Sequence, residues 1–120
     1  MFKVIIAGSR DFNDYSLLES NLDFLLSNKI KNGEEIVIVS GKARGADTEG
    51  EKYAINRNFS IEEHPANWNK YGKSAGYIRN REMALSADAC VCFWDGKSKG
   101  TKHMINLAKE HNLLLEIINY

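Results

Sequence analysis

The sequence lacks an excess of charge of either sign. Sixteen Lys and Arg residues are balanced by sixteen Asp and Glu residues, so the formal net charge of the 120-residue chain is zero at pH 7. Proteins that bind nucleic acid duplexes or anionic membrane surfaces depend on a basic excess that neutralises phosphate groups. The balance therefore disfavours nucleic acid and membrane partners, but it leaves room for a local basic pocket.

Cysteine and long apolar runs are scarce as well. The only two cysteines, Cys90 and Cys92, lie two residues apart in an apolar run, and neighbours this close cannot cross-link a fold. No apolar stretch approaches the ~18 residues that a membrane span requires. The apolar start of the chain, residues 1–8, is too short for a signal peptide. We therefore expect a cytoplasmic protein in which both thiols are buried in the core.

Short apolar runs alternate with helical patterns along the chain. Strands are expected at residues 2–7, 36–39, 59–63, 89–94 and 113–118, and helices follow each of the first four, with a polar loop at 64–76 before the third helix. The first helix shows a stripe at Leu18, Leu22, Leu25 and Leu26 after the capping pair Asn13-Asp14. This alternation predicts one domain over residues 1–120, a small Rossmann-like three-layer α/β/α sandwich with a mainly parallel five-stranded sheet.

The loop after the first expected strand contains Gly8, Ser9 and Arg10. Ligands of such folds bind beyond the carboxyl ends of the strands, where this loop begins. Glycine lets the backbone approach a ligand, serine offers a hydroxyl group, and arginine offers a forked cation suited to phosphate. The same three residues are also typical of an ordinary turn with a surface arginine. This loop therefore indicates a ligand site only in combination with the loops after the second and fourth strands.

The loop after the second expected strand, residues 40–47, has two glycines four positions apart. Gly41 and Gly45 flank Arg44, but their spacing fits neither the P-loop nor the dinucleotide-binding fingerprint. The amide groups at the start of the following helix would still favour an anion. Asp47 has two open interpretations, as an acceptor for ribose hydroxyl groups or simply as an N-terminal helix residue.

The loop after the fourth expected strand combines glycine, hydroxyl groups and a carboxylate. Gly96 and Gly100 bracket Ser98, Asp95 precedes them, and Thr101 stands at the start of the next helix. Free amides and hydroxyl groups at a helix start make a cradle for an oxyanion, whereas the plain alternative is a glycine turn with a helix cap. We expect all three loops to meet at one edge of the sheet.

The helix that precedes the fourth strand begins with a further basic group. Arg79 and Met83 are four residues apart and share a helix face, so we expect Arg79, with Asn80 beside it, to project over the strand ends. Glu82 is expected on a solvated face.

Two tryptophans and three histidines complete the candidates. Trp68 and Trp94 flank the loops, and each either stacks on a base or caps the edge of the core. The histidines show no spacing with Cys or carboxylates that is typical of a metal site, so no metal is expected.

A dispersed set of short motifs connects these loops to a known family. The motifs are Gly8-Ser-Arg-Asp-Phe12 with Asp14-Tyr15, Val39-Ser-Gly41, Ala43-Arg-Gly-Ala-Asp47, Pro65-Ala66 with Trp68, Gly72-Lys73, Ile78-Arg-Asn80, and Phe93-Trp-Asp-Gly96 with Ser98, Gly100 and Thr101. With them the chain resembles, over nearly its full length, the YspA-related branch of the SLOG superfamily, which includes LOG-type phosphoribohydrolases and DprA/Smf proteins. The resemblance implies a Rossmann-like fold, a pocket for a nucleotide-derived ligand and, by analogy with relatives, a homo-oligomer.

The resemblance carries over less well to enzymatic activity. LOG enzymes cleave the N-glycosidic bond of nucleoside monophosphates with an arginine in Arg-Lys-x-x-Met and a glutamate in Gly-Gly-x-Gly-Thr-x-x-Glu. Here Asn80 replaces the lysine, and Met104 stands where the glutamate belongs. A thioether cannot act as an acid or base, so LOG-type hydrolysis is not expected. An N-glycosidase or phosphohydrolase would have to use Asp47, Asp95 or Glu82 instead.

The leading hypothesis is therefore a binding domain for a nucleotide or nucleotide-derived phosphate ligand, related to NAD or ADP-ribose, that acts as a sensor, carrier or sequestering protein. No cofactor beyond such a ligand is expected. Arg10, Arg44 and Arg79 would neutralise phosphate, while Ser98, Gly100 and Thr101 would bind it. Asp47 or Asp95 would accept hydrogen bonds from ribose hydroxyl groups. A third hypothesis, by analogy with DprA, is single-stranded DNA binding. The basic residues expected near the pocket are Arg10, Lys42, Arg44, Lys73, Arg79, Lys97 and Lys99.

Overall fold

A five-stranded parallel sheet forms the middle layer of the protein in a computed structural model that describes residues 1–120. The strands are β1 (Phe2–Gly8), β2 (Ile36–Ser40), β3 (Ser60–Glu63), β4 (Ala89–Trp94) and β5 (Leu114–Asn119). They lie in the order β3-β2-β1-β4-β5, and every neighbouring pair is parallel. The predicted sandwich with a parallel sheet is confirmed.

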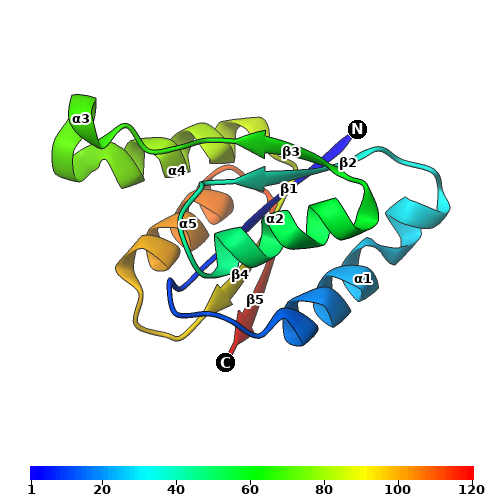
Figure 1. The fold of residues 1–120 in the computed structure, drawn as a ribbon. Helices are drawn as coiled ribbons and strands as arrows, with labels where there is room; N and C mark the ends of the chain where they lie inside the picture. The colour runs from blue at the N-terminus through cyan, green and yellow to red at the C-terminus, as the bar shows by residue number, and fades with distance from the viewer.

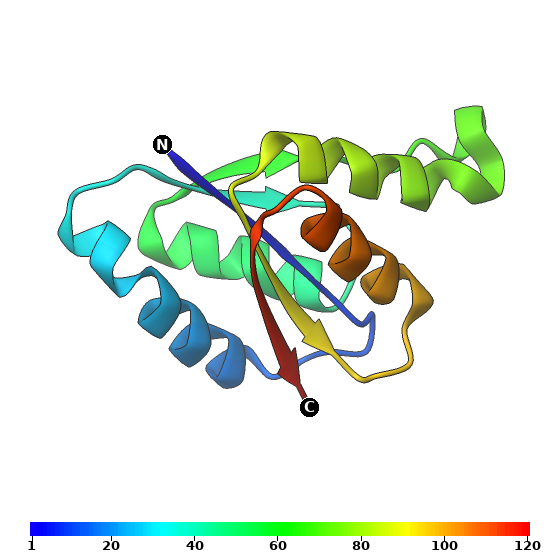
Figure 2. The same cartoon turned by 180° about the vertical axis from the view of Figure 1, so that it is seen from behind.

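Helices cover both faces of the sheet (Figures 1 and 2). The helices α1 (Tyr15–Lys31) and α2 (Ala46–Arg57) pack on one face, and α4 (Ala75–Ser86) and α5 (Lys99–Glu110) pack on the other. The short helix α3 (Trp68–Tyr71) and a 3-10 turn (Gly72–Ser74) project at one end of the molecule. None of the helices combines the length and the apolar character needed to cross a membrane.

Alternate residues of the central strands supply two separate cores. Val4 and Ile6 of β1 pack under α1 and α2, whereas Ile5 and Ala7 pack under α4 and α5. The continuous apolar runs in the sequence follow from this arrangement, because a parallel strand with helices on both faces buries every side chain. As predicted, both thiols are buried, in the core beneath α4 and α5.

Polar side chains fix where the helices begin. Asp14 caps α1 by accepting a hydrogen bond from the Leu17 amide at 3.1 Å, in line with the predicted capping pair. The expectation of an unbroken loop over residues 64–76 is wrong, because this segment contains α3. The side chain of Asn67 accepts a hydrogen bond from the Lys70 amide at 3.1 Å and so starts a helical turn that has no apolar periodicity of its own.

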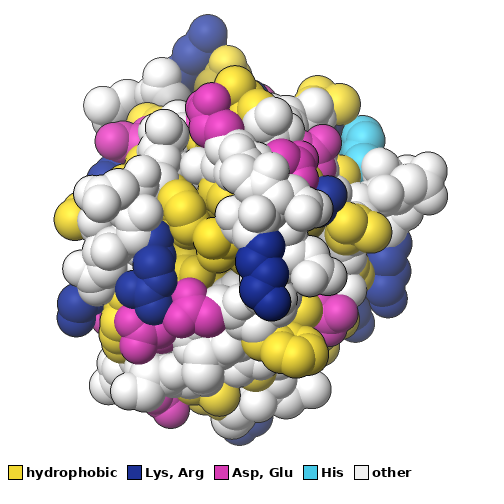
Figure 3. All heavy atoms as spheres, turned by 90° about the vertical axis from the view of Figure 1, so that its right-hand side faces the viewer, with side chains coloured by type: hydrophobic (Ala, Val, Ile, Leu, Met, Phe, Trp, Pro, Cys, Tyr) yellow, Lys and Arg dark blue, Asp and Glu magenta, His cyan; other side chains and the backbone are white.

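The sheet is less completely covered near its β5 edge. An apolar cavity of about 250 Å³ lies between α1 and the first residues of β1, β4 and β5, and Leu25, Leu26, Leu114 and Leu115 are among its lining residues. Apolar side chains also appear in a central hollow on the side of the molecule seen in Figure 3. Since β5 is an edge strand, its apolar side chains remain partly or largely exposed.

Candidate functional site

The strand order creates one point where the chain changes direction across the sheet. The chain runs outward from β1 through β2 to β3, then returns to the other side of β1 to form β4 and β5. The loops that leave β1, β2 and β4 all emerge at the same edge of the sheet, on the left of Figure 1. Ligands of open parallel sheets bind at such a switch point, so this edge is the candidate site.

Three adjoining cavities form a cleft at this edge. The outer cavity, of about 670 Å³, is lined by Ser9, Arg10, Asp11, Arg44, Asp95, Ser98 and Gly100. The inner cavity, of about 90 Å³, is lined by Ala7, Gly8, Arg10, Ala43, Asp47, Arg79, Asn80, Met83, Ser98, Gly100, Thr101 and Met104. The lateral cavity, of about 230 Å³, is lined by Arg10, Gly41, Lys42, Ala43, Arg44, Pro65, Ala66, Trp68 and Arg79. Arg10 lines all three cavities.

Three arginines of the cleft have no carboxylate partner. Arg10, Arg44 and Arg79 form none of the ion pairs in the structure, although Arg79 lies near enough to Asp47 for an electrostatic interaction. Lys42, which also lines the lateral cavity, differs, because its Nζ lies 2.8 Å from Glu51 and 3.7 Å from Glu63. The arginines therefore supply the available positive charge of the cleft.

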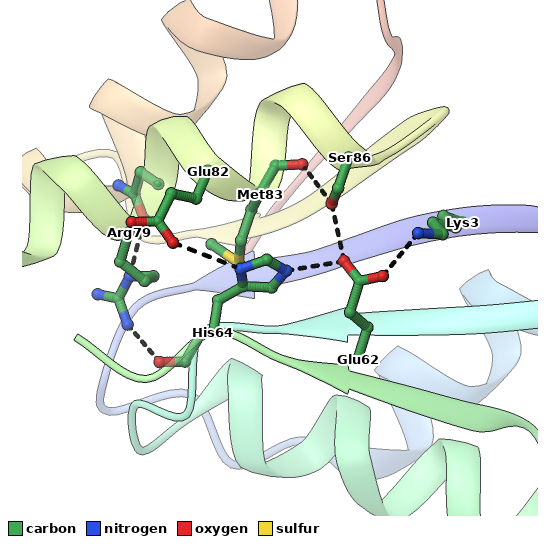
Figure 4. Close-up of polar contacts among 9 residues, drawn as sticks. Lys3, Glu62, His64, Arg79, Glu82, Met83 and Ser86 are labelled. Atoms are coloured by element: carbon green, nitrogen blue, oxygen red, sulfur yellow. Dashed lines mark hydrogen bonds and ion pairs between the residues drawn. The ribbon is translucent and has the colours of Figure 1, made fainter. Parts of the chain in front are cut away.

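Backbone and amide oxygens hold the Arg79 side chain across the end of β2. Its Nη1 donates a hydrogen bond to the Gly41 carbonyl, and its Nε donates one to Asn80 Oδ1 at 3.1 Å (Figure 4). A Cβ at residue 41 would lie 2.8 Å from Nη1, so this approach needs a glycine. Burial lowers the pKa of Arg79, which the nearby Asp47 carboxylate opposes, but a guanidinium stays charged in proteins.

Asp47 is a nearly buried carboxylic acid on the wall of the inner cavity. Only 7% of the residue is exposed, and its Oδ2 accepts a hydrogen bond from the Ala43 amide at 3.2 Å. No side chain donates a hydrogen bond to it. Burial raises the pKa of Asp47 to about 6, and this effect outweighs the opposing influence of the Ala43 amide and of Arg79. The group therefore changes charge near neutral pH.

The loop between β4 and α5 is shaped by Asp95 and Ser98. Asp95 Oδ1 accepts hydrogen bonds from the amides of Lys97 and Ser98 at 2.8 and 2.9 Å, and these bonds lower the pKa of Asp95. Ser98 caps α5, because its Oγ accepts a hydrogen bond from the Thr101 amide at 3.3 Å. Asp95 thus fixes the turn that places the start of α5 at the cleft.

Ser9 and Gly45 join the other two loops. The Ser9 carbonyl accepts hydrogen bonds from the amides of Phe12 and Ala46, and its hydroxyl accepts one from the Asp95 amide at 3.2 Å. Gly45 has a φ of +81°, and a Cβ there would lie 2.3 Å from the Ser9 carbonyl oxygen. Only glycine permits this contact, so these two residues hold the loops after β1 and β2 close together.

A polar network supports the far side of α4, outside the cleft (Figure 4). Glu62 accepts hydrogen bonds from Lys3 Nζ at 2.6 Å and Ser86 Oγ at 2.8 Å, and His64 Nε2 lies 2.7 Å from it. Glu82 faces this network, with its Oε2 3.9 Å from His64 Nδ1. The carboxylate of Glu82 therefore belongs to the support of α4 and does not line the three cavities.

The structure brings most of the residues chosen from the sequence to this cleft. Those that line its cavities are Gly8, Ser9, Arg10, Gly41, Arg44, Asp47, Trp68, Arg79, Asn80, Asp95, Ser98, Gly100 and Thr101. Four others do not line them: Gly45, Glu82, Trp94 and Gly96. The Trp94 indole is partly buried, packs against the core beneath α4 and α5, and donates a hydrogen bond to the Ser98 carbonyl at 3.1 Å. Of the two tryptophans, only Trp68 offers a face to the cleft.

Several lining residues are absent from the sequence-based selection. Asp11 lines the outer cavity and accepts a hydrogen bond from Tyr120 at the other end of the chain, at 2.7 Å. Pro65 and Ala66 line the lateral cavity. Asp11 stands in the same motif as Arg10, and Pro65 and Ala66 stand in the same motif as Trp68. Membership of these motifs is the sequence signal that could have identified them. Of the expected basic residues, Lys73, Lys97 and Lys99 do not line the cavities.

Comparison with known proteins assigns the family. Residues 2–71 match the family described as "YspA, cpYpsA-related SLOG family". The Gene 61 protein of Mycobacterium phage D29 is 34% identical over 126 residues, which cover 100% of this chain and 97% of that protein. The chain belongs to this SLOG family, as the resemblance implied.

Solved structures of DprA proteins share the fold. DNA processing protein A from Streptococcus pneumoniae superposes with a TM-score of 0.77 at 19% identity, over 100% of this chain and 51% of that one. DNA processing protein A from Helicobacter pylori, whose structure is described for its single-stranded DNA binding mode, gives a TM-score of 0.65 at 23% identity, over 97% of this chain and 64% of that one. The chain thus spans about half to two thirds of the length of these neighbours.

Proposed function

We propose that the cleft binds a nucleotide or a nucleotide-derived ligand through its phosphate group, so that the protein acts as a sensor, carrier or sequestering protein. The observation that carries this proposal is the convergence of Arg10, Arg44 and Arg79 on one cleft without ion-pair partners. Arg79 uses its Nε and Nη1 for Asn80 and Gly41 but keeps its Nη2. Guanidinium donors that no carboxylate occupies match phosphate oxygens in charge and geometry.

The start of α5 is where we expect the phosphate group. Ser98 and Gly100 line both the outer and the inner cavity, and the Ser98 hydroxyl lies 3.0 Å from the Thr101 hydroxyl. The first amides of a helix have no acceptor within the helix, and the helix dipole adds positive potential there. A phosphate at this point meets amide and hydroxyl donors on one side and arginines on the other.

The lateral cavity supplies a surface for a base. Trp68 is half exposed and lines this cavity together with Pro65 and Ala66, whereas the lining of the outer cavity is entirely polar. Stacking of a base on an aromatic side chain stabilises a complex by about 1–3 kcal/mol. A ligand with a sugar-phosphate part and an aromatic base, such as a derivative of NAD or ADP-ribose, suits this division of polar and apolar surface.

The charges of the cleft favour a small ligand over a polymer. Single-stranded DNA is the competing ligand because the H. pylori neighbour is described as binding it. A polymer needs a continuous basic track, but Asp11, Asp47 and Asp95 line the cleft among its cations. These carboxylates would meet successive phosphates of a strand, whereas a single nucleotide can avoid them.

The test is calorimetric titration with AMP, ADP-ribose and NAD, supported by thermal unfolding. A ligand at about 100 times its Kd stabilises the fold by roughly 2.7 kcal/mol, which is a visible shift in Tm. For the compound that binds, Arg79→Ala is expected to weaken affinity about tenfold or more, the usual loss for a charge-assisted hydrogen bond. Arg81→Ala is the matched control, since Arg81 lies on the same helix, is exposed and lines none of the cavities.

Two results would overturn the proposal. One is that no nucleotide binds, or that Arg79→Ala and Arg81→Ala bind equally well. The other is that a single-stranded oligonucleotide binds more tightly than every mononucleotide, with an affinity that falls steeply as salt is added.

A further inference from the structure

The inner cavity is small and has one carboxylate. Its volume is about 90 Å³, which corresponds to roughly three water-sized groups. It is the smallest of the three cavities of the cleft, so we expect it to take one edge of a nucleotide, such as the hydroxyl edge of the sugar. Asp47 is the only acidic residue among its lining residues, which also include Arg79 and two methionines, Met83 and Met104.

The Asp47 carboxylate has acceptor capacity that the protein leaves unused. A carboxylate offers about four acceptor positions, yet only backbone amides approach Asp47, and no side chain donates to it. Asp47 lines the inner cavity, so its remaining acceptor positions are available to a ligand that enters there. The site therefore favours a ligand that brings a donor to this oxygen.

The neighbours of Asp47 restrict the kind of donor. Arg79 and Arg10 line the same cavity, so an ammonium group would meet like charges there. A neutral donor avoids this repulsion, and the size of the cavity selects a small one. A sugar hydroxyl satisfies both conditions.

The other carboxylates near the cleft do not line the inner cavity. Asp95 Oδ1 accepts two backbone amides, and Asp11 accepts the Tyr120 hydroxyl. Glu82 faces His64 outside the cavities. Only Asp47 combines burial, position in the inner cavity and freedom from side-chain partners.

We infer that Asp47 accepts a hydrogen bond from a ribose hydroxyl of the ligand, and that the cleft therefore selects ribonucleotides over their deoxy counterparts. This inference rests on the proposed nucleotide function and assigns the sugar specificity of the same cleft. The phosphate lies at the start of α5, where the outer and inner cavities meet and Arg10 and Arg79 line the inner one, and the sugar turns its hydroxyl edge inward to Asp47. A wrong sugar leaves the buried carboxylate without its donor, and such a loss discriminates strongly.

Titration of the wild-type protein with AMP, 2′-deoxy-AMP and 3′-deoxy-AMP tests this directly, because the change is made in the ligand and folding is not at issue. At least one deoxy analogue is expected to bind about tenfold more weakly than AMP, or worse. In Asp47→Ala the ratio is expected to fall to about twofold or less, because the acceptor is gone. Glu82→Gln is the matched control, and it should keep the wild-type ratio.

The outcomes separate the two proposals. If AMP and both deoxy analogues bind the wild-type protein equally, and Arg79→Ala weakens all three, nucleotide binding stands and the role of Asp47 is overturned. A preference for AMP that persists unchanged in a folded Asp47→Ala variant also overturns it. If AMP, ADP-ribose and NAD all fail to bind, the proposed function itself fails, and this inference falls with it.

Discussion

The guanidinium of Arg79 donates a hydrogen bond to the carbonyl oxygen of Gly41. A side chain at residue 41 would collide with this guanidinium. The hydrogen bond joins α4 to the end of β2 across the candidate site. It also sets Arg79 beside Asp47, because a Cβ at residue 41 would lie 3.0 Å from Asp47 Oδ2. One glycine thus permits a cation and a carboxylic acid to share the wall of the inner cavity.

Gly41→Ala should damage both stability and binding. The added methyl group would press on Arg79 and on Asp47, and overpacking of this kind costs about 1–3 kcal/mol. Chemical denaturation measures the loss of stability, and titration with AMP measures the loss of affinity. Gly100→Ala is the contrast, because no atom lies within 4 Å of a Cβ at that position. Equal stability losses in the two variants would contradict the close fit at Gly41.

Asp47→Asn should stabilise the protein at neutral pH. Burial raises the pKa of Asp47 from 3.8 to about 6, so the folded state is favoured by protonation. The resulting stabilisation is complete below pH 3.8 and is lost as the pH rises through 6. Above that pH the ionised carboxylate costs the wild type about 1–3 kcal/mol, which the neutral amide avoids.

Urea denaturation across this pH range measures the difference for Asp47. The charged groups that act on its titration are Arg79 on α4, which lowers its pKa, and Glu51 on α2, which raises it. The variant should exceed the wild type in stability above pH 6 and equal it below pH 3.8. A variant that is less stable than the wild type at every pH would show that the carboxylate is retained for structure.

Glu62→Gln should destabilise the fold with the opposite pH dependence. Burial alone would raise the pKa of Glu62, but hydrogen bonds from His64, Lys3 and Ser86 outweigh it and lower the pKa to about 2. The stabilisation is therefore present above 4.5 and lost as the pH falls toward 2. At neutral pH we expect a loss of about 1 kcal/mol, measured by thermal unfolding.

The matched control for this network is Glu63→Gln, one residue further along β3. Glu63 is exposed and lies 3.7 Å from Lys42, outside the network of Glu62. Its substitution should change Tm little. Equal losses for Glu62→Gln and Glu63→Gln would mean that the network around His64 does not support α4.

Trp68→Ala should separate base recognition from phosphate recognition. Loss of a stacking surface is expected to weaken AMP binding by about 1–3 kcal/mol while leaving the affinity for pyrophosphate unchanged. Tyr71→Ala serves as the control, because Tyr71 belongs to the same short helix and lines none of the cavities. Competition between AMP and pyrophosphate measures both affinities. Parallel loss of AMP and pyrophosphate binding in Trp68→Ala would contradict a stacking role.

The apolar periodicity and the positions of the loops in the sequence predict much of this architecture. The i and i+4 spacing of Arg79 and Met83 predicts a shared helix face, and both side chains line the inner cavity. Three loops that follow three strands were expected at one edge, and they meet there because all strands are parallel. These features depend on local sequence and on the geometry of parallel sheets, so sequence reasoning reaches them.

Tertiary contacts decided what the sequence left open. The sequence makes Trp68 and Trp94 equal candidates for stacking on a base. In the structure, the Trp94 indole donates a hydrogen bond to the Ser98 carbonyl. Glu82 lies one residue before Met83 on α4, but it faces His64, which comes from the end of β3. Lys42 was expected to add charge to the pocket, yet Glu51 and Glu63 pair with it. His64 and Glu63 are distant in sequence from Glu82 and Lys42, and no local pattern reveals such partners. Ser98 is only four residues from Trp94, but their hydrogen bond depends on the conformation of the loop between them.

The central claim is that unpaired arginines recognise the phosphate group of a nucleotide. The most direct measurement is the affinity of the wild-type protein for AMP and for adenosine in parallel calorimetric titrations, since the two ligands differ only in the phosphate. We predict that AMP binds at least about tenfold more tightly than adenosine, and that Arg79→Ala removes most of this difference. Equal affinities for AMP and adenosine would contradict the account.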